Sequence, residues 1–178
     1  MKKIGILAIH GDVAEHAAIL RKLKIEPVEV RAKKDFAKLD GLILPGGEST
    51  TISKLAEKFG LTSEIKKFAA SGKPILGTCA GLILLARFGL LNVEIARNAY
   101  GRQVDSFEAE LSIPKISKKK IPVAFIRAPK IISVGKSVEV LAEFENVPIL
   151  VRQKNIFATS CHPEILGATA IHAFIFAR

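Results

Sequence analysis

Short apolar runs alternate with amphipathic stretches along the first half of the 178-residue chain. The apolar runs predict strands, and unbroken hydrophobicity is typical of parallel strands that are covered on both faces; they lie at 3–9, 27–30, 39–44 and 74–76. The amphipathic stretches carry apolar residues at helical spacing, and they lie at about 13–23, 50–59, 62–70 and 82–85. Strands that alternate with helices in this way predict βαβ units and a parallel sheet.

The pattern changes after about residue 92. Short runs joined by polar or proline-containing turns predict strands at 107–111, 121–126, 137–142 and 147–151. A further inner strand is expected at 155–160 and a closing helix at 168–177. We therefore expect one α/β domain over residues 1–178, a flavodoxin-like three-layer sandwich whose mostly parallel central sheet carries an added antiparallel portion.

Turn residues follow the predicted strands and begin the helices after them. Asp12 is expected to cap the first helix, and Ser or Thr at 49–50 the helix after the third strand, because short polar side chains accept hydrogen bonds from the first turn. Gly11, the glycine pair at 46–47 and Cys79 all stand just past strand ends. Since ligands of parallel sheets bind at the carboxyl ends of the strands, the active site is expected at this edge.

Net charge raises the question of a nucleic-acid partner, because the chain carries +10 at pH 7. The basic residues are scattered as pairs and one triplet, and aromatic residues make up only 6% with no Trp, so platforms for stacking bases are scarce. We expect a solvated lysine-rich surface and no nucleic-acid partner. A non-catalytic basic binding protein remains the remote alternative.

Location and redox chemistry follow from the apolar runs and the cysteines. Arg87 interrupts the longest apolar stretch, which falls short of the roughly 18 residues of a membrane span, so no membrane association is expected. The N-terminal run is interpreted as a buried strand rather than a signal peptide, which predicts a cytoplasmic protein. Two cysteines without a C-x-x-C pair indicate neither a disulfide framework nor a metal site. No cofactor is expected.

Cys79 lies in the run Gly-Thr-Cys-Ala-Gly at 77–81, between a predicted strand and a predicted helix. Glycines on both sides allow the tight backbone turn that ordinary packing does not need. A thiol at this junction stands at a helix N-terminus, where the dipole and the free N–H groups favour the thiolate. The arrangement is a nucleophile elbow with cysteine in place of serine.

His162-Pro163-Glu164 offers a base and a residue that orients it. In extended chain, residues two apart face the same side, and the proline favours an extended conformation at His162. Glu164 can then hold one imidazole nitrogen while the other addresses Cys79, as in a catalytic triad. Cys161 faces the opposite side and is expected in the core. A metal site from these residues is disfavoured because adjacent ligands point apart.

Pro-Gly-Gly-Glu-Ser at 45–49 follows the third predicted strand. This run can be a plain turn, or it can bring backbone close to a substrate. In the second case the N–H groups of Gly47 and Ala80 would stabilise the oxyanion of a tetrahedral intermediate. Ser49 is expected to cap a helix rather than act as a nucleophile, because it lacks an elbow.

These features resemble those of class I, triad-type glutamine amidotransferases. The similarity is closest to the family of glutaminase subunits of pyridoxal 5′-phosphate synthases, and it extends from residue 4 to residue 164. The runs that carry it are GGESTT at 46–51, GTCAGL at 77–82, RNAYGRQVDSFE at 97–108 and FIRAP at 125–129. One departure is His10, since the family has Gln before the glycine at position 11, close to the partner contact and the oxyanion region.

The resemblance implies that Cys79 attacks the amide of L-glutamine to give a glutamyl thioester and ammonia. It implies His162 as the acid and base and Glu164 as its orienter. Implied substrate-binding residues are Gly47, Glu48, Ser49, Arg97, Ile126 and Arg127. A guanidinium grips an α-carboxylate with paired hydrogen bonds, which agrees with the two arginines.

The implied partner is a separate (β/α)8 synthase subunit in a hetero-oligomer, which takes up the ammonia to make pyridoxal 5′-phosphate. Two other enzymes remain open as alternatives: an amidotransferase subunit of another synthase, and a γ-glutamyl hydrolase.

Overall fold

The computed structural model of the chain describes residues 1–96 and 106–177. A seven-stranded sheet forms its centre, with the strand order β2-β1-β3-β4-β11-β10-β9. The first five of these strands are parallel; β10 then pairs antiparallel with β11, and β9 pairs antiparallel with β10. The strands of this sheet are β1 (Lys3–Leu7), β2 (Glu26–Val30), β3 (Gly41–Leu44), β4 (Ile75–Thr78), β9 (Glu139–Phe144), β10 (Val147–Gln153) and β11 (Ile156–Thr159).

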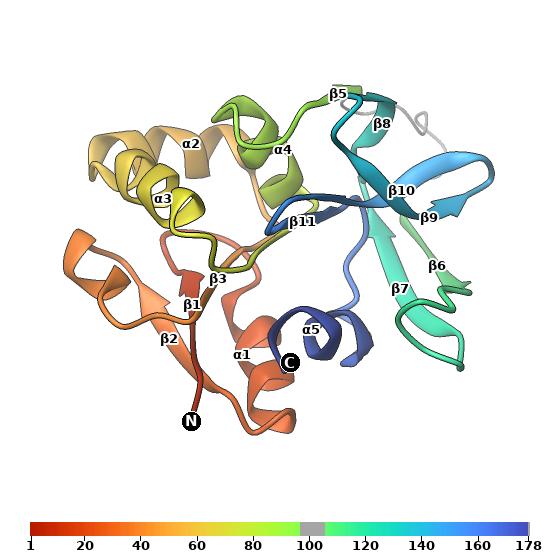
Figure 1. Ribbon diagram of the computed structural model, residues 1–178, viewed down its shortest axis with the longest axis horizontal. Helices are drawn as coiled ribbons and strands as arrows, with labels where there is room; N and C mark the ends of the chain where they lie inside the picture. Colours follow the sequence, from red (N-terminus) through yellow and green to blue (C-terminus); the bar gives the residue numbers. More distant parts are fainter. Residues whose placement is uncertain (97–105, 178) are drawn as a thin grey trace.

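Helices cover both faces of the sheet, which makes the fold a three-layer α/β sandwich (Figure 1). Helices α2, α3 and α4 lie on one face, and α1 and α5 lie on the other. Their bounds are α1 (Val13–Lys22), α2 (Ser49–Lys58), α3 (Leu61–Ala70), α4 (Ala80–Arg87) and α5 (Ala170–Phe176), and a short 3-10 helix spans Lys33–Phe36. No helix of the described residues is long and apolar enough to span a membrane.

Two buried apolar clusters fill the spaces between the layers. Neighbouring residues of one strand go to different clusters: Ile43 packs with α1 and α5, whereas Leu42 and Leu44 pack with α2, α3 and α4. This follows from the pleat, which points successive side chains to opposite faces. The unbroken apolar runs of the sequence therefore mark strands that are buried on both sides.

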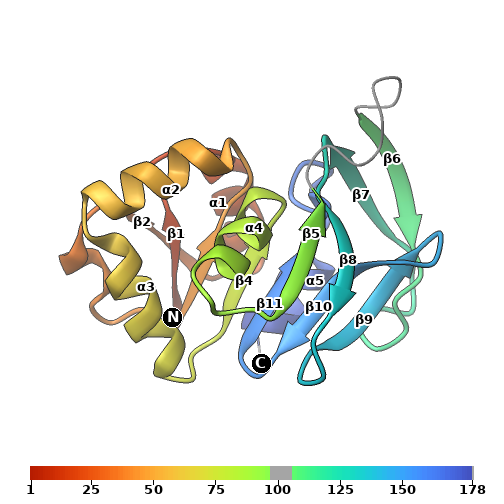
Figure 2. The same ribbon diagram turned by 90° about the horizontal axis from the view of Figure 1, so that it is seen from above.

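Two small antiparallel ribbons flank the sheet at the end that β9 and β10 form (Figure 2). One pairs β6 (Ser106–Leu111) with β7 (Ile121–Ile126), and the other pairs β5 (Val93–Ala96) with β8 (Lys130–Val134). The predicted antiparallel portion is thus confirmed, although the sequence pattern missed β5 and β8. Residue His162 joins the first ribbon, because its backbone makes an antiparallel bridge with Ala124 of β7.

The parallel strand order 2-1-3-4 followed by β11 is the flavodoxin-like order, as expected. In sheets of this kind, ligands bind outside the carboxyl ends of the strands near the point where the strand order reverses. The segments that leave β1, β3, β4 and β11 at these ends carry Asp12, Gly47, Cys79 and His162, respectively.

Candidate active site

Cys79 sits on a strained turn between β4 and α4. Its backbone has φ 49 and ψ −101, a positive φ that a residue with a side chain rarely adopts. The Cys79 N–H donates to Thr159 O of the neighbouring strand at 2.8 Å, which fixes the turn. A Cβ on Gly81 would run into the carbonyl oxygen of Leu44, so only glycine lets α4 begin this close to β3. The predicted elbow geometry is confirmed.

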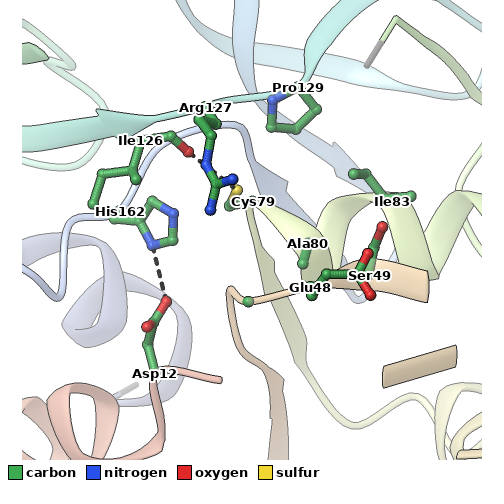
Figure 3. A pocket seen from close by; sticks show the side chains of 11 residues that line it. Asp12, Glu48, Ser49, Cys79, Ala80, Ile83, Ile126, Arg127, Pro129 and His162 are labelled. Atoms are coloured by element: carbon green, nitrogen blue, oxygen red, sulfur yellow. Dashed lines mark hydrogen bonds and ion pairs between the residues drawn. The ribbon is translucent and has the colours of Figure 1, made fainter. Parts of the chain in front are cut away.

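The thiol of Cys79 opens into a cavity of about 300 Å³ at the carboxyl ends of the strands. Figure 3 shows the residues that line it. Eight of them were singled out from the sequence: Gly47, Glu48, Ser49, Cys79, Ala80, Ile126, Arg127 and His162. The sequence reasoning had not assigned Asp12, Ile83 and Pro129 to the cavity. Arg97 lies outside the described residues.

His162 is held in place from two sides. Its backbone N–H donates to Ala124 O at 2.7 Å, and its ring Nδ1 lies 2.7 Å from Glu164 Oε1. The carboxylate accepts a hydrogen bond from Nδ1–H. The other ring nitrogen then lies on the side of the cavity where Cys79 is found (Figure 3). The structure therefore brings Cys79, His162 and Glu164 together in the order nucleophile, base and orienter.

The buried pair of His162 and Glu164 has shifted pKa values. Burial alone lowers the pKa of His162, but its interactions with Cys79 and Glu164 outweigh burial and raise that pKa to about 10. Burial raises the pKa of Glu164, and the hydrogen bond from His162 opposes that rise. An imidazolium is thus favoured beside the thiol at neutral pH. It can stabilise a thiolate and hold a proton for a leaving group.

Asp12 has a different role from the one expected. It occupies the N-cap position of α1, but its side chain makes no capping hydrogen bond. Instead Asp12 Oδ2 lies 3.4 Å from His162 Nδ1, and 29% of the Asp12 side chain is exposed. Asp12, His162 and Glu164 place candidate metal-ligand atoms within 4.8 Å of one another. The 2.7 Å contact with Glu164 already occupies His162 Nδ1, so we assign the group to proton chemistry.

The expected cap of α2 is corrected by the structure. Glu48 is the N-cap residue, whereas Ser49 is the first helical residue. The Glu48 carboxylate accepts hydrogen bonds from the Thr50 and Thr51 N–H groups, at 3.0 and 2.6 Å, and from Thr51 Oγ1. These bonds, led by the one from the Thr51 hydroxyl, lower the pKa of Glu48 to about 2. Glutamate reaches the free N–H groups here because the turn before α2 is extended.

Gly47 lies where a tight contact between two loops requires glycine. Its φ is +135, and a Cβ there would approach the Cα of Gly11 to 3.0 Å. The same Cβ would lie 3.4 Å from the ring of His10. The loop after β1 thus packs directly on the turn after β3, next to the cavity that Gly47 and Ala80 both line.

The end of β7 brings backbone to the thiol. Cys79 Sγ lies 3.9 Å from the carbonyl oxygen of Ile126, and the next residue, Arg127, has a positive φ of 43. Figure 3 shows the Arg127 guanidinium pointing into the cavity. A cation in the same cavity as the nucleophile is suited to holding a substrate carboxylate.

The second cysteine is chemically separate from the first. Cys161 is fully buried, and Thr159 Oγ1 lies 3.0 Å from its sulfur. Burial raises the pKa of the Cys161 thiol to about 12, so it stays protonated. Both cysteines are free. The expectation that Cys161 belongs to the core is confirmed.

A strand-to-helix elbow that exposes a nucleophile at the carboxyl edge of a parallel sheet defines a class of α/β enzymes that work through a covalent intermediate. Comparison with known proteins narrows the class. The model of the SNO glutamine amidotransferase family matches residues 6–177, and the chain belongs to this family.

Curated relatives and solved structures agree with the family. The chain is 46% identical to the pyridoxal 5′-phosphate synthase subunit PdxT of Pseudothermotoga lettingae, over 96% of this chain and 92% of the relative. It is 40% identical to the subunit of that name from Carboxydothermus hydrogenoformans, over 99% and 97%. A crystal structure of a glutamine amidotransferase superposes with a TM-score of 0.93 at 41% identity, covering 98% of this chain and 97% of the other.

Proposed function

We propose that the protein hydrolyses L-glutamine to L-glutamate and ammonia and delivers the ammonia to a pyridoxal 5′-phosphate synthase subunit. One observation carries the chemistry: Cys79 stands on a strained elbow and shares a cavity with His162, whose Nδ1 is 2.7 Å from Glu164 Oε1. The family and the names of the relatives support glutamine as the substrate and a synthase as the context.

The thiolate of Cys79 attacks the side-chain amide carbon of glutamine, and a new C–S bond forms as the carbonyl π bond opens onto oxygen. When the intermediate collapses, His162 gives its proton to the amide nitrogen, the C–N bond breaks, and ammonia leaves a glutamyl thioester. Water then attacks the thioester while His162 takes one proton from it. Glutamate departs and the thiolate returns. The pKa of about 10 suits His162 to the first of these proton transfers.

The oxyanion formed in both steps is assigned to the N–H groups of Gly47 and Ala80. Ala80 directly follows the nucleophile and begins α4, so its N–H belongs to the positive end of the helix dipole. Gly47 faces the same cavity from the turn after β3. Backbone donors held by rigid turns stabilise developing charge without reorganising, which is the basis of such sites.

Substrate binding is assigned to Gly47, Glu48, Ser49, Arg97, Ile126 and Arg127. The structure supports this for the five residues that it describes, because all five line the cavity. Since capping bonds occupy the Glu48 carboxylate, its part is to hold the backbone turn that faces the substrate. Arg127, with Arg97, supplies the positive charge that the α-carboxylate of glutamine requires.

The direct test is ammonia release from glutamine by the Cys79→Ala variant, measured with the synthase subunit present. We expect activity to be abolished, because the Cys79 thiolate is the group that attacks the amide carbon and forms the thioester. Cys161→Ala is the matched control: it also removes a thiol, but one buried away from the cavity, and it should keep its activity. Ammonia release that survives in Cys79→Ala would refute the proposal.

The partner is tested by comparing the isolated chain with the chain mixed with a (β/α)8 pyridoxal 5′-phosphate synthase subunit. We expect that subunit to stimulate ammonia release and to consume the ammonia. Stimulation by a different synthase, or full hydrolysis of γ-glutamyl peptides without any partner, would point to the two alternative enzymes.

His10, which lies against Gly47, is the residue through which docking can reach the oxyanion site. A cytoplasmic location stays a prediction.

A further inference from the structure

A chain of buried polar side chains continues inward from Glu164, on the side away from the cavity. His16 of α1 lies with its Nε2 atom 3.5 Å from Glu164 Oε1 and 3.1 Å from Thr78 Oγ1. Its other nitrogen, Nδ1, lies 2.9 Å from Nε2 of His172 in α5. Both histidines are 0% exposed. The triad thus continues through two more imidazoles that sequence reasoning had not singled out.

Both histidines are neutral. Burial, followed by the nearby charges of His172 and His162, lowers the pKa of His16 well below 6.5. Burial lowers the pKa of His172 to about 4. Each neutral ring carries one proton, so each ring has one donor and one acceptor nitrogen.

The position of the proton on His16 follows from what its two nitrogens face. Nε2 faces two oxygens: the Glu164 carboxylate at 3.5 Å, which can only accept, and the Thr78 hydroxyl at 3.1 Å, which can accept or donate. A proton on Nε2 suits both contacts, so we place it there. Nδ1 of His16 is then an acceptor, and His172 must donate to it from Nε2. This leaves Nδ1 of His172 as an unprotonated acceptor. That nitrogen has no hydrogen-bond partner among the described residues.

The opposite arrangement is unfavourable at both ends. It would aim a lone pair of His16 at the Glu164 carboxylate, which the Thr78 hydroxyl alone could offset, and it would bury an unpaired N–H on His172. A buried donor without a partner is destabilising, because the hydrogen bond that it made with water in the unfolded chain is not replaced. The hydrogen bond between the two histidines therefore runs from His172 to His16, and the Nε2–H of His16 points to Thr78 Oγ1 and the Glu164 carboxylate.

Glu164 depends on these donors. Among the residues that the structure describes, no partner is found for its Oε2 atom. His162 and His16 both lie next to Oε1, at 2.7 and 3.5 Å. Of the other titratable groups around Glu164, Asp12 raises its pKa, whereas the Cys161 thiol stays protonated and adds no charge. A neutral hydrogen-bond donor stabilises the carboxylate without placing a second positive charge next to the His162 imidazolium.

We propose that His16 is a positioning residue of the active site: as a neutral Nε2–H donor it keeps Glu164 ionised and turned toward His162, and His172 fixes the tautomer of His16. The proposal rests on the proposed function, in which Glu164 orients His162. It assigns α1 and α5 a part in catalysis, although neither helix contributes a residue that touches the substrate.

Two substitutions of His16 separate the roles of its two nitrogens. The amide nitrogen of Gln reaches the place of Nε2, so His16→Gln keeps a donor for Glu164. The amide of Asn reaches only the place of Nδ1, so His16→Asn keeps contact with His172 but leaves Glu164 without its second donor. We expect His16→Asn to lower kcat for ammonia release by about 10- to 100-fold, the effect of one lost hydrogen bond to a charged group. The KM for glutamine should stay within about twofold, because no cavity residue changes.

A pH profile distinguishes positioning from general loss of structure. Without its donor, Glu164 takes up a proton at higher pH, so the acid limb of kcat/KM should move upward in His16→Asn and return toward the wild-type position in His16→Gln. Activities are normalised to the fraction of native protein, taken from the urea unfolding curve of each variant. Equal kcat losses in both variants with an unmoved acid limb would overturn the proposal.

The wild-type protein provides a test that needs no folded variant. Nitrogen-15 NMR of the imidazoles should find His16 and His172 neutral and protonated at Nε2 over roughly pH 5 to 8. A His16 ring that is protonated at Nδ1, or that titrates near pH 6.5, would overturn the proposal. These outcomes are independent of the proposed function, which fails only if Cys79→Ala still releases ammonia.

Discussion

At the scale of single residues, the position of His162 depends on the absence of a side chain at Gly46. A Cβ at Gly46 would collide with Cε1 of the His162 ring and would approach Asp12 Oδ2 to 2.5 Å. The imidazole therefore lies directly on the peptide backbone of the turn after β3. This contact couples the proposed oxyanion turn to the proposed base.

We predict that Gly46→Ala lowers kcat/KM for glutamine by about 100-fold, because displacement of a catalytic group by about 1 Å has an effect of that size. Ammonia release with the synthase subunit present measures it. Gly72→Ala is the control, since a Cβ at Gly72 meets nothing within 4 Å although its φ is +79. That variant should lose some stability but keep its activity per folded molecule. Unchanged activity in Gly46→Ala would contradict the assigned contact.

At the scale of elements, helix α4 begins where strand β3 allows it to approach. Gly81, in the first turn of α4, lies against the carbonyl oxygen of Leu44 at the end of β3. Gly77 at the other side of the elbow has the same constraint, because its Cβ would come within 2.7 Å of the Gly81 backbone. The two glycines of the elbow thus serve the packing of a helix on a strand, and this packing aims Cys79 at the cavity.

We predict that Gly81→Ala destabilises the protein by about 1–3 kcal/mol, the range expected for forcing extra volume into a packed interior. The sign of the change in the free energy of unfolding is informative, because Gly→Ala within a helix normally stabilises a protein by up to about 1 kcal/mol. Urea unfolding of the variant and the wild type measures the difference. A variant as stable as the wild type, or more stable, would show that α4 can move away from β3 freely.

The helices and strands show which parts of the fold the sequence predicts and why it does not predict the others. Apolar runs located the parallel strands, because strands buried on both faces leave an unmistakable pattern. Strands β5 (Val93–Ala96) and β8 (Lys130–Val134) were missed because each is short and partly exposed, and they pair with each other across a long stretch of chain. The cap of α2 was misassigned because Glu48 is a less usual N-cap than Ser or Thr.

At the scale of the whole molecule, Gly47, Cys79 and His162 come together because they follow strand ends at one edge of the sheet, and the end of β7 in the flanking ribbon adds Ile126 and Arg127. The topology of parallel strands guarantees this meeting, and it could be read from the order of elements. His16 and His172 could not be found in this way. They lie in the buried faces of α1 and α5, the first and last helices, and no local pattern brings residues so far apart in sequence together. A titratable residue in a predicted apolar helix face was the available signal.

The buried histidines also predict how global stability depends on pH. In the unfolded chain His172 takes up a proton near pH 6.5, whereas in the folded protein its pKa is about 4. As pH falls from 6.5 toward 4, His172 binds a proton in the unfolded state but not in the folded state, so the free energy of unfolding decreases. The decrease approaches about 1.4 kcal/mol per pH unit for this group, or about 3 kcal/mol over the whole interval.

Other groups titrate in the same interval, so the contribution of His172 must be measured as a difference. Burial raises the pKa of Glu164, which acts in the opposite direction, while His16 acts in the same direction as His172. We therefore compare wild type with His172→Leu by urea unfolding at several values between roughly pH 4 and 8. The difference in the free energy of unfolding, wild type minus variant, should be constant well above pH 6.5 and should decrease below it, as the wild type loses the contribution of His172. Curves that stay parallel down to the acid end would mean that His172 carries a proton in the folded protein. That result would contradict the neutral state assigned to His172.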